Sequence, residues 1–253
     1  MKKLPILISI PHGGYKIPDE INNRISIKES DLFDDSDPYT IEIYNLGDKV
    51  SEVITTDIAR AFVDLNRSPD DRPPKNTDGI VKSVTCYAIP IYIPGMEPDN
   101  EIVENLIKSY YEPYHNKIKK ALSQIDVELA LDCHSMADIA PPISPDIGKK
   151  RPMICLGNVY GETCSMEITK KLADCFQYAF SLEESEVAIN KPFSGGYIIR
   201  TYGEKPIPWI QVEMNRALYL RSTWFKRNGL KIDRSRLNDL NKMFETTLHR
   251  FFF

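Results

Sequence analysis

Four short, mainly apolar runs constrain the fold of this chain more than any other feature. They are Pro5–Ile10, Leu129–Asp132, Met153–Leu156 and Trp209–Val212. Continuous runs of this length are typical of strands that are covered by helices on both faces. The segments between them show helical periodicity, and strands that alternate with helices indicate βα units. We therefore predict an α/β fold with a mixed, mostly parallel sheet between helices.

Helical patterns lie between these runs. In Glu101–Ile125 the apolar residues recur at three- and four-residue steps, with Asp99 or Asn100 as the candidate N-cap. Pro113 should kink or interrupt this helix, because proline lacks a backbone donor. The other predicted helices are Tyr39–Val53, Thr163–Phe180 and Asp233–Phe251.

The remaining segments contain a further strand-like run and two loops. Ala61–Leu65 has the apolar character of a strand, whereas Ser68–Pro98 and Pro141–Gly148 are rich in proline and turn residues. Long loops of this kind are uncommon in compact domains and are often functional. There is no internal repeat and no low-complexity linker, so we expect residues 1–253 to form one domain.

The composition excludes several classes of protein. The 253 residues are 42% hydrophobic and carry a net charge of −4, which is unlike a disordered or fibrous chain. No basic run suggests nucleic-acid binding, and no apolar stretch approaches the ~20 residues that span a bilayer. The five cysteines are odd in number and form no C-x-x-C pair, which favours free thiols in a reducing compartment. After Met1-Lys2-Lys3 the apolar run is too short for a signal peptide. We expect a cytoplasmic protein, and the sequence leaves its oligomeric state open.

Two of the four histidines directly follow predicted strands. His12 comes after the first run, before Gly13-Gly14, and His134 comes after the second. In open α/β sheets, ligands bind beyond the carboxyl ends of the strands. Two imidazoles that meet there could supply part of a hydrolytic zinc site, which usually has three protein ligands. The alternative is that each histidine only caps its strand and hydrogen-bonds to a loop.

The residues beside His134 favour the metal site. Side chains alternate along a strand, so Asp132 should point to the same side as His134 and Cys133 to the other. Asp132 could then accept the second ring N–H of a metal-bound histidine. Cys133, facing away, is better explained as a small buried apolar residue than as a nucleophile.

Three further polar groups are candidates for the same edge of the sheet. Asp34-Asp35-Ser36-Asp37-Pro38 could supply a carboxylate ligand, although acidic residues also cap helices. In Asp64-Leu65-Asn66-Arg67, the amide and the guanidinium could bind a substrate carboxylate; otherwise Arg67 is a surface salt-bridge partner. Glu213 ends a buried strand, where a carboxylate is costly unless it is paired or serves as a general base.

Together these motifs resemble the N-formylglutamate amidohydrolase family. The matching blocks are Pro11-His12-Gly13-Gly14, Asp37, Asp64-Leu65-Asn66-Arg67, Asp132-x-His134-Ser135, Ser194-Gly195-Gly196-Tyr197 and Val212-Glu213-x-Asn215-Arg216. Each block is weak alone, but six in the family's order are specific. The resemblance implies a fold similar to zinc-exopeptidases, namely the zinc carboxypeptidases and aspartoacylase-type deacylases. Those relatives have a metal-binding glutamate three residues after the first histidine, where this chain has Tyr15.

The resemblance also implies roles for individual residues. His12, Asp37 and His134 would hold zinc or another divalent metal, with Asp35 as the second candidate for the carboxylate. Glu213 would be the general base. Arg216 is the second catalytic candidate, because one arginine would stabilise the developing oxyanion. The implied substrate-binding residues are Asn66 and Arg67 for the α-carboxylate, Arg60 and Arg200, with Arg216, for a second carboxylate, and Gly195, Gly196 and Tyr197. His115 echoes a family pattern but is expected to be structural.

The leading hypothesis is a zinc-dependent amidohydrolase. It would cleave a small acyl group, formyl or similar, from an N-acyl amino acid with a free carboxylate, such as N-formylglutamate. Two alternatives remain open: a carboxypeptidase-like hydrolase of a short peptide or cell-wall fragment, and a metal-free binding module on the same fold. The presence of both histidines, Glu213 and the Asn66-Arg67 pair argues against the binding module.

Overall fold

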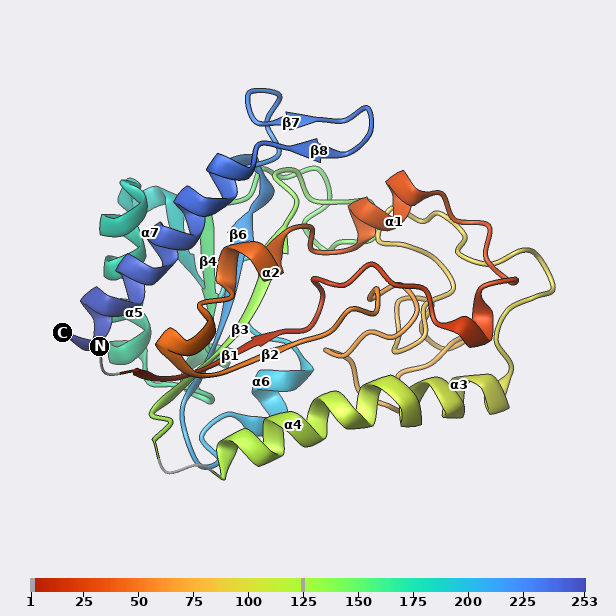
Figure 1. Ribbon diagram of the computed structural model, residues 1–253, viewed down its shortest axis with the longest axis horizontal. Coiled ribbons are helices and arrows are strands. Elements are labelled where there is room, and N and C mark those ends of the chain that lie inside the picture. Colours follow the sequence, from red (N-terminus) through yellow and green to blue (C-terminus); the bar gives the residue numbers. More distant parts are fainter. Residues whose placement is uncertain (1–2, 124–125) are drawn as a thin grey trace.

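A six-stranded sheet forms the centre of the computed structural model, which describes residues 3–123 and 126–253 (Figure 1). Its order is β2-β1-β3-β6-β4-β5. The first four strands of this order are parallel, β4 is antiparallel to β6, and β5 is parallel to β4. The predicted mixed, mostly parallel sheet is thus confirmed. The strands are β1 (Leu4–Ile10), β2 (Val50–Thr55), β3 (Leu129–Met136), β4 (Ile154–Gly157), β5 (Val187–Ile189) and β6 (Trp209–Asn215), and a separate hairpin pairs β7 (Phe225–Lys226) with β8 (Lys231–Ile232).

Helices cover both faces of this sheet (Figure 1). Along β1, Ile6 and Ile8 join the apolar cluster under α5 and α7, whereas Leu7 joins the opposite cluster with Ile118 of α4. Both faces are therefore buried, which explains why the strands have continuous apolar runs. The helices are α1 (Glu29–Asp35), α2 (Thr40–Tyr44), α3 (Asn100–Leu106), α4 (Glu112–Leu122), α5 (Met166–Phe180), α6 (Tyr197–Tyr202) and α7 (Arg234–Phe252). Short 3₁₀ turns lie at Asp19–Ile21, Gly47–Lys49, Val159–Gly161, Glu184–Glu186 and Arg216–Leu218.

The helix signals read from the sequence are largely present. Asp99 caps α3 by accepting a hydrogen bond from the backbone N–H of Ile102 at 2.9 Å. The interruption expected at Pro113 takes the form of a π-helical turn at Ile107–Tyr111 between α3 and α4. A wider turn at this place accommodates a residue that cannot donate to the preceding turn. Ile125, the expected end of this helix, and Met1-Lys2 lie outside the described residues.

Two predicted elements are wrong. The expected helix Tyr39–Val53 ends at Tyr44, and its second half is strand β2, at one edge of the sheet. Gly47, with a φ of 58°, breaks the helical path, and pairing with β1 then favours the strand. The run Ala61–Leu65 forms turns instead of a strand, and its four apolar residues are buried in a core cluster.

The two proline-rich segments are loops, as predicted. Residues 68–98 and 141–148 contain no helix and no strand beyond isolated bridges. The five cysteines are free thiols. Across the described ranges, no helix has both the length and the apolar character needed to cross a membrane.

Candidate active site

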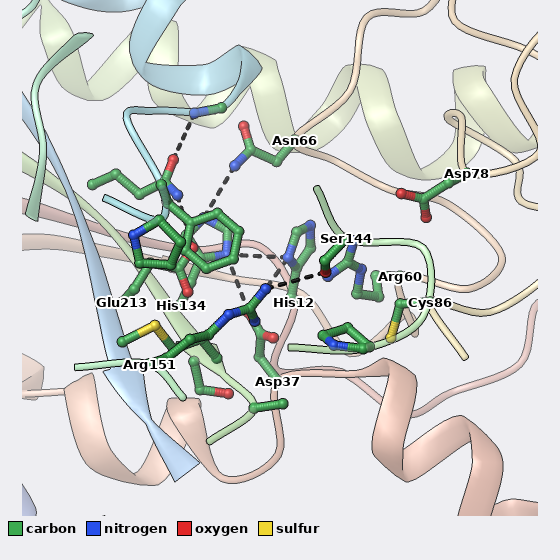
Figure 2. A pocket seen from close by; sticks show the side chains of 18 of the residues that line it. His12, Asp37, Arg60, Asn66, Asp78, Cys86, His134, Ser144, Arg151 and Glu213 are labelled. Atoms are coloured by element: carbon green, nitrogen blue, oxygen red, sulfur yellow. Dashed lines mark hydrogen bonds and ion pairs between the residues drawn. The ribbon is translucent and has the colours of Figure 1, made fainter. Parts of the chain in front are cut away.

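The carboxyl ends of three neighbouring parallel strands bring the predicted polar residues together. His12 follows β1, His134 lies in β3, and Glu213 of β6 is paired in register with His134. These side chains line a cavity of about 400 Å³ at this edge of the sheet (Figure 2). The position agrees with the rule that α/β sheets bind ligands beyond their strand ends.

At the floor of the cavity, three buried side chains converge. His134 Nδ1 lies 3.1 Å from His12 Nδ1 and 3.1 Å from Asp37 Oδ2. His12 Nδ1 lies 3.4 Å from the same Asp37 oxygen. All three residues are less than 5% exposed.

The second nitrogen of each histidine ring is occupied by a different carboxylate. His12 Nε2 lies 2.7 Å from Asp64 Oδ1, and His134 Nε2 lies 2.9 Å from Asp132 Oδ2. Carboxylates accept hydrogen bonds, so in the neutral form of each ring Nε2 carries the proton and Nδ1 presents a lone pair. Two lone pairs and a carboxylate oxygen then face one point, an arrangement that a cation stabilises. The bond expected between Asp132 and His134 is present.

The spacing of these three atoms fits a small divalent metal. Zinc binds nitrogen and oxygen ligands at about 2.0–2.2 Å, so tetrahedral ligand atoms lie about 3.3 Å apart. The three separations in the cluster are 3.1, 3.1 and 3.4 Å. His12, Asp37 and His134 therefore have both the donor chemistry and the spacing of a three-residue metal site.

Asp37, rather than Asp35, joins the histidines. The backbone N–H of Asp37 donates to the carbonyl of His12 at 3.0 Å, which fixes the acidic turn beside the first histidine. Asp35 points elsewhere: both of its oxygens contact Lys82 Nζ, at 2.8 and 2.9 Å. Lys82 is fully buried, so this ion pair is a permanent part of the interior.

The close contacts shift the pKa values of the cluster. Burial alone would raise the pKa of Asp37, but the two histidines hold it well below its usual range. Burial would likewise raise the pKa of Asp64, but His12 and Arg60 lower it strongly. For His134, burial opposes protonation, yet the adjacent Asp132 and Asp37 hold its pKa well above normal. The cluster thus attracts positive charge, whether a proton or a metal ion.

Glu213 lies beside this cluster and is oriented by Gln211. The Gln211 side chain donates from Nε2 to Glu213 Oε1 at 2.8 Å and accepts from the backbone N–H of Gly196 at 2.6 Å. Burial raises the pKa of the Glu213 carboxyl. A Cβ at Gly196 would collide with the Asn66 amide, so glycine is needed for this close approach. The result is a carboxylate with raised proton affinity, fixed in the cavity wall.

Asn66 and Arg67, the predicted clamp for a substrate carboxylate, both make hydrogen bonds within the protein. Asn66 Nδ2 donates to Asp132 at 3.1 Å, and Asn66 Oδ1 accepts from the backbone N–H of Ile198 at 2.7 Å. These bonds favour a supporting role for Asn66 in the histidine network. Arg67 also lines the cavity, where its Nη2 donates to Asp78 at 2.6 Å. Its side chain is 35% exposed, so its outer edge is accessible to a substrate.

Two other arginines of the cavity wall serve buried carboxylates. Arg216 donates to Asp37 Oδ1 at 3.1 Å, to Ser135 Oγ at 3.0 Å and to the Asp34 and Ser36 carbonyls. All three of its guanidinium nitrogens are used, which favours positioning of Asp37 over contact with an oxyanion. Arg60 Nη2 donates to Asp64 at 3.0 Å.

Of the three remaining substrate-binding candidates, one lines the cavity and two do not. Gly195 lines the cavity, but Tyr197 and Arg200 do not. Arg200 is exposed and donates to the Gly195 carbonyl and to Ser194. The Tyr197 ring packs against His115, with 6.0 Å between centroids.

His115 has the structural environment that the sequence indicated. Its ring nitrogens contact the Tyr202 hydroxyl at 2.9 Å and the Leu65 carbonyl at 3.0 Å. Burial lowers its pKa to about 4, so the ring is neutral near neutral pH.

Sequence reasoning missed four side chains that line the cavity or contact residues beside it. Gln211 had a usable signal, because it lies two residues before Glu213 on the same face of the strand. Asp64 stood in a quoted motif but carried no sign that it would meet His12. Lys82 and Arg151 lie in or beside the two long loops, and their contacts are not encoded in local spacing. Arg151 lines the cavity across from Arg60, as Figure 2 shows.

Comparison with known sequences identifies similar proteins over most of the chain. A family model described as N-formylglutamate amidohydrolase matches residues 4–220. N-formylglutamate deformylase of Pseudomonas putida is 26% identical over 230 residues, which cover 87% of this chain and 84% of that protein. The enzyme of the same name from Pseudomonas aeruginosa is 26% identical over 227 residues, covering 86% and 83%.

Two solved structures share the fold. N-formylglutamate amidohydrolase from Ralstonia eutropha JMP134 superimposes with a TM-score of 0.79 at 20% identity, covering 98% of this chain and 93% of that chain. A gene product of Agrobacterium tumefaciens gives a TM-score of 0.67 at 14% identity, covering 98% and 91%. At these identities the likeness concerns the fold alone.

Proposed function

Because the chain belongs to the N-formylglutamate amidohydrolase family, we propose that it hydrolyses the amide of an N-formyl amino acid. The products would be formate and the free amino acid. The first candidate substrate is N-formylglutamate, the compound named for the relatives from both Pseudomonas species. We further propose that the reaction depends on a divalent metal, with zinc as the first candidate.

One observation carries this proposal: the two Nδ1 atoms and the Asp37 oxygen converge beside a buried glutamate. The histidines and Asp37 would hold the metal. When bound there, zinc supplies a Lewis acid that acidifies water and polarises the amide carbonyl. Asp64 and Asp132 fix the ring tautomers, so that both lone pairs point to the same place.

The proton transfers fall to Glu213. Its raised pKa brings its proton affinity closer to that needed near neutral pH, as expected of a general base. The carboxylate takes a proton from the attacking water and delivers it to the leaving amine nitrogen. Gln211 holds one carboxylate oxygen during both transfers, which keeps the other directed to the reacting groups.

Arg67 is the proposed anchor for the substrate α-carboxylate. It lines the cavity. Its Nη2 donates to the Asp78 carboxylate, and its Nε donates to the Asp78 backbone carbonyl. The remaining face of the guanidinium offers further donors of fixed geometry. Anchoring there would place the formamide toward the metal cluster.

A hydrolysis screen with metal analysis tests the proposal. Protein purified without chelator is assayed for metal content, then for release of formate or acetate from N-formyl and N-acetyl amino acids and for cleavage of short peptides. We expect a near-stoichiometric divalent metal, formate release from N-formyl substrates and loss of activity with a chelator. Peptide cleavage without deformylation would favour the carboxypeptidase-like alternative. Absence of metal and turnover, even after zinc is added, would favour a binding module.

A further inference from the structure

The arginines that the sequence offers for a second substrate carboxylate are committed elsewhere. Arg216 holds the acidic turn through Nη1 and Nη2 and donates to Ser135 through Nε, and Arg200 lies outside the cavity. Arg60 is surrounded by negative charge, since Asp64, Asp35 and Asp78 all act on its guanidinium. A further anion beside Arg60 would be repelled by these carboxylates.

The environment of Arg151 is different. It is only 5% exposed, yet it lines the cavity, entering from the side opposite Arg60 and Asp78 (Figure 2). Its Nε and Nη2 donate to the two oxygens of Asp146 at 3.0 and 2.9 Å. Nη2 also donates to Ser144 Oγ at 3.1 Å, and the guanidinium carbon lies 4.8 Å from the centre of the Phe193 ring. These contacts fix the plane of the guanidinium, and Nη1 makes no hydrogen bond to any described residue.

The segment that carries Arg151 is anchored to the catalytic strand. The backbone N–H of Arg151 donates to the Asp138 carbonyl at 2.9 Å, which closes the 138–151 loop. Asn215 Nδ2 donates to the Arg151 carbonyl at 3.2 Å and to Asp138 Oδ1 at 3.1 Å. Asn215 lies two residues after Glu213 on the same face of β6. The position of Arg151 is therefore fixed relative to the proposed base.

We propose that Arg151 and Ser144 are the residues that bind the side-chain carboxylate of the N-formyl amino acid. This inference rests on the proposed function and names the residues that would determine its side-chain specificity. The guanidinium edge that Asp146 leaves unused offers a donor of fixed direction, with the Ser144 hydroxyl beside it. Arg67 and Arg151, which both line the cavity, would then bind the two carboxylates.

A binding experiment tests the subsite without requiring turnover. Isothermal titration of the zinc-supplemented protein with L-glutamate and with L-glutamine compares two ligands that differ in side-chain charge and carry no acyl group. The variants are Arg151→Met, Arg151→Lys and Ser144→Ala. Arg234→Met is the matched control, because Arg234 is exposed and, among the described residues, pairs with Glu42 alone. Circular dichroism and melting temperature verify the fold of each variant.

We expect the wild-type protein to bind glutamate about 10- to 100-fold more tightly than glutamine, the range for a hydrogen bond to a charged group. Arg151→Met should remove most of this preference by weakening glutamate alone, Arg151→Lys should recover part of it, and Ser144→Ala should reduce it. Arg234→Met should leave it unchanged. Equal affinities in the wild-type protein, or a preference that survives in folded Arg151→Met, would overturn the subsite. Failure of the proposed function appears separately, as absence of deformylation by a protein that still discriminates the two ligands.

Discussion

Replacing Glu213 with glutamine should strongly lower kcat while leaving the fold and the metal site intact. The substitution preserves the size of the side chain, and an amide oxygen can still accept the 2.8 Å bond from Gln211. The substitution leaves His12, Asp37 and His134 unchanged, so the zinc content should equal that of the wild-type protein. Burial raises the pKa of Glu213, which means that ionisation of this carboxyl costs free energy in the folded protein. A neutral amide avoids that cost, so the melting temperature should be unchanged or slightly higher.

The expected loss in kcat follows from the role assigned to the carboxylate. General-base catalysis is commonly worth about 10²- to 10⁴-fold, or about 3–5 kcal/mol in the activation barrier. Formate release, zinc content and melting temperature should be measured on one preparation, with the exposed Glu162→Gln as the control. A kcat within about threefold of wild type, at full zinc occupancy, would refute the assignment of the base. A lower melting temperature with normal turnover would show instead that Glu213 only stabilises the fold.

Three other substitutions test separate parts of the structure. Asp64→Asn removes the carboxylate on His12 Nε2, so zinc affinity should fall about 10- to 100-fold in a chelator competition; unchanged affinity would exclude this support. Arg67→Lys should raise KM for substrates with a free α-carboxylate but not for their methyl esters, and equal effects on both would assign Arg67 a structural role. His115 has a folded pKa of about 4, below the ~6.5 of an unfolded histidine, so the unfolded state binds the proton first. Between pH 6.5 and 4 the wild-type protein should therefore lose up to roughly 3 kcal/mol of unfolding free energy that His115→Gln does not lose, measured by urea titration; parallel pH profiles would contradict the buried neutral ring.

The interior strands could be predicted because burial on both faces leaves a continuous apolar run. β1, β3, β4 and β6 all lie where such runs occur, and β3 and β6 extend beyond their runs to include His134 and Glu213. The edge strand β2 has no such run, because only Val50 and Ile54 are buried. Its apolar residues happen to match helical steps. Its structure depends on backbone pairing with β1, which is a non-local contact that local periodicity does not encode.

The candidate site could be predicted in the same limited way. Strand ends mark where His12, His134 and Glu213 must lie, because topology brings adjacent parallel strands to one edge. Some partners of these residues come from loops whose paths the sequence does not fix. Asp64, for example, contacts His12 Nε2 from 52 residues away. Such contacts depend on how a long segment folds back, so neither spacing nor composition reveals them.

The charges of the site explain why two arginines of the cavity wall are engaged within the protein. A buried carboxylate is costly unless a cation accompanies it, and three of the buried carboxylates have a Lys or Arg partner: Arg216 for Asp37, Arg60 for Asp64, and Lys82 for Asp35. Arginines near a metal site are therefore needed first to neutralise the carboxylates that orient the ligands. Substrate recognition must use the guanidinium edges that these carboxylates leave free. By that criterion the position of an arginine in a motif is a weaker guide to substrate binding than the charges and hydrogen bonds that already surround its guanidinium.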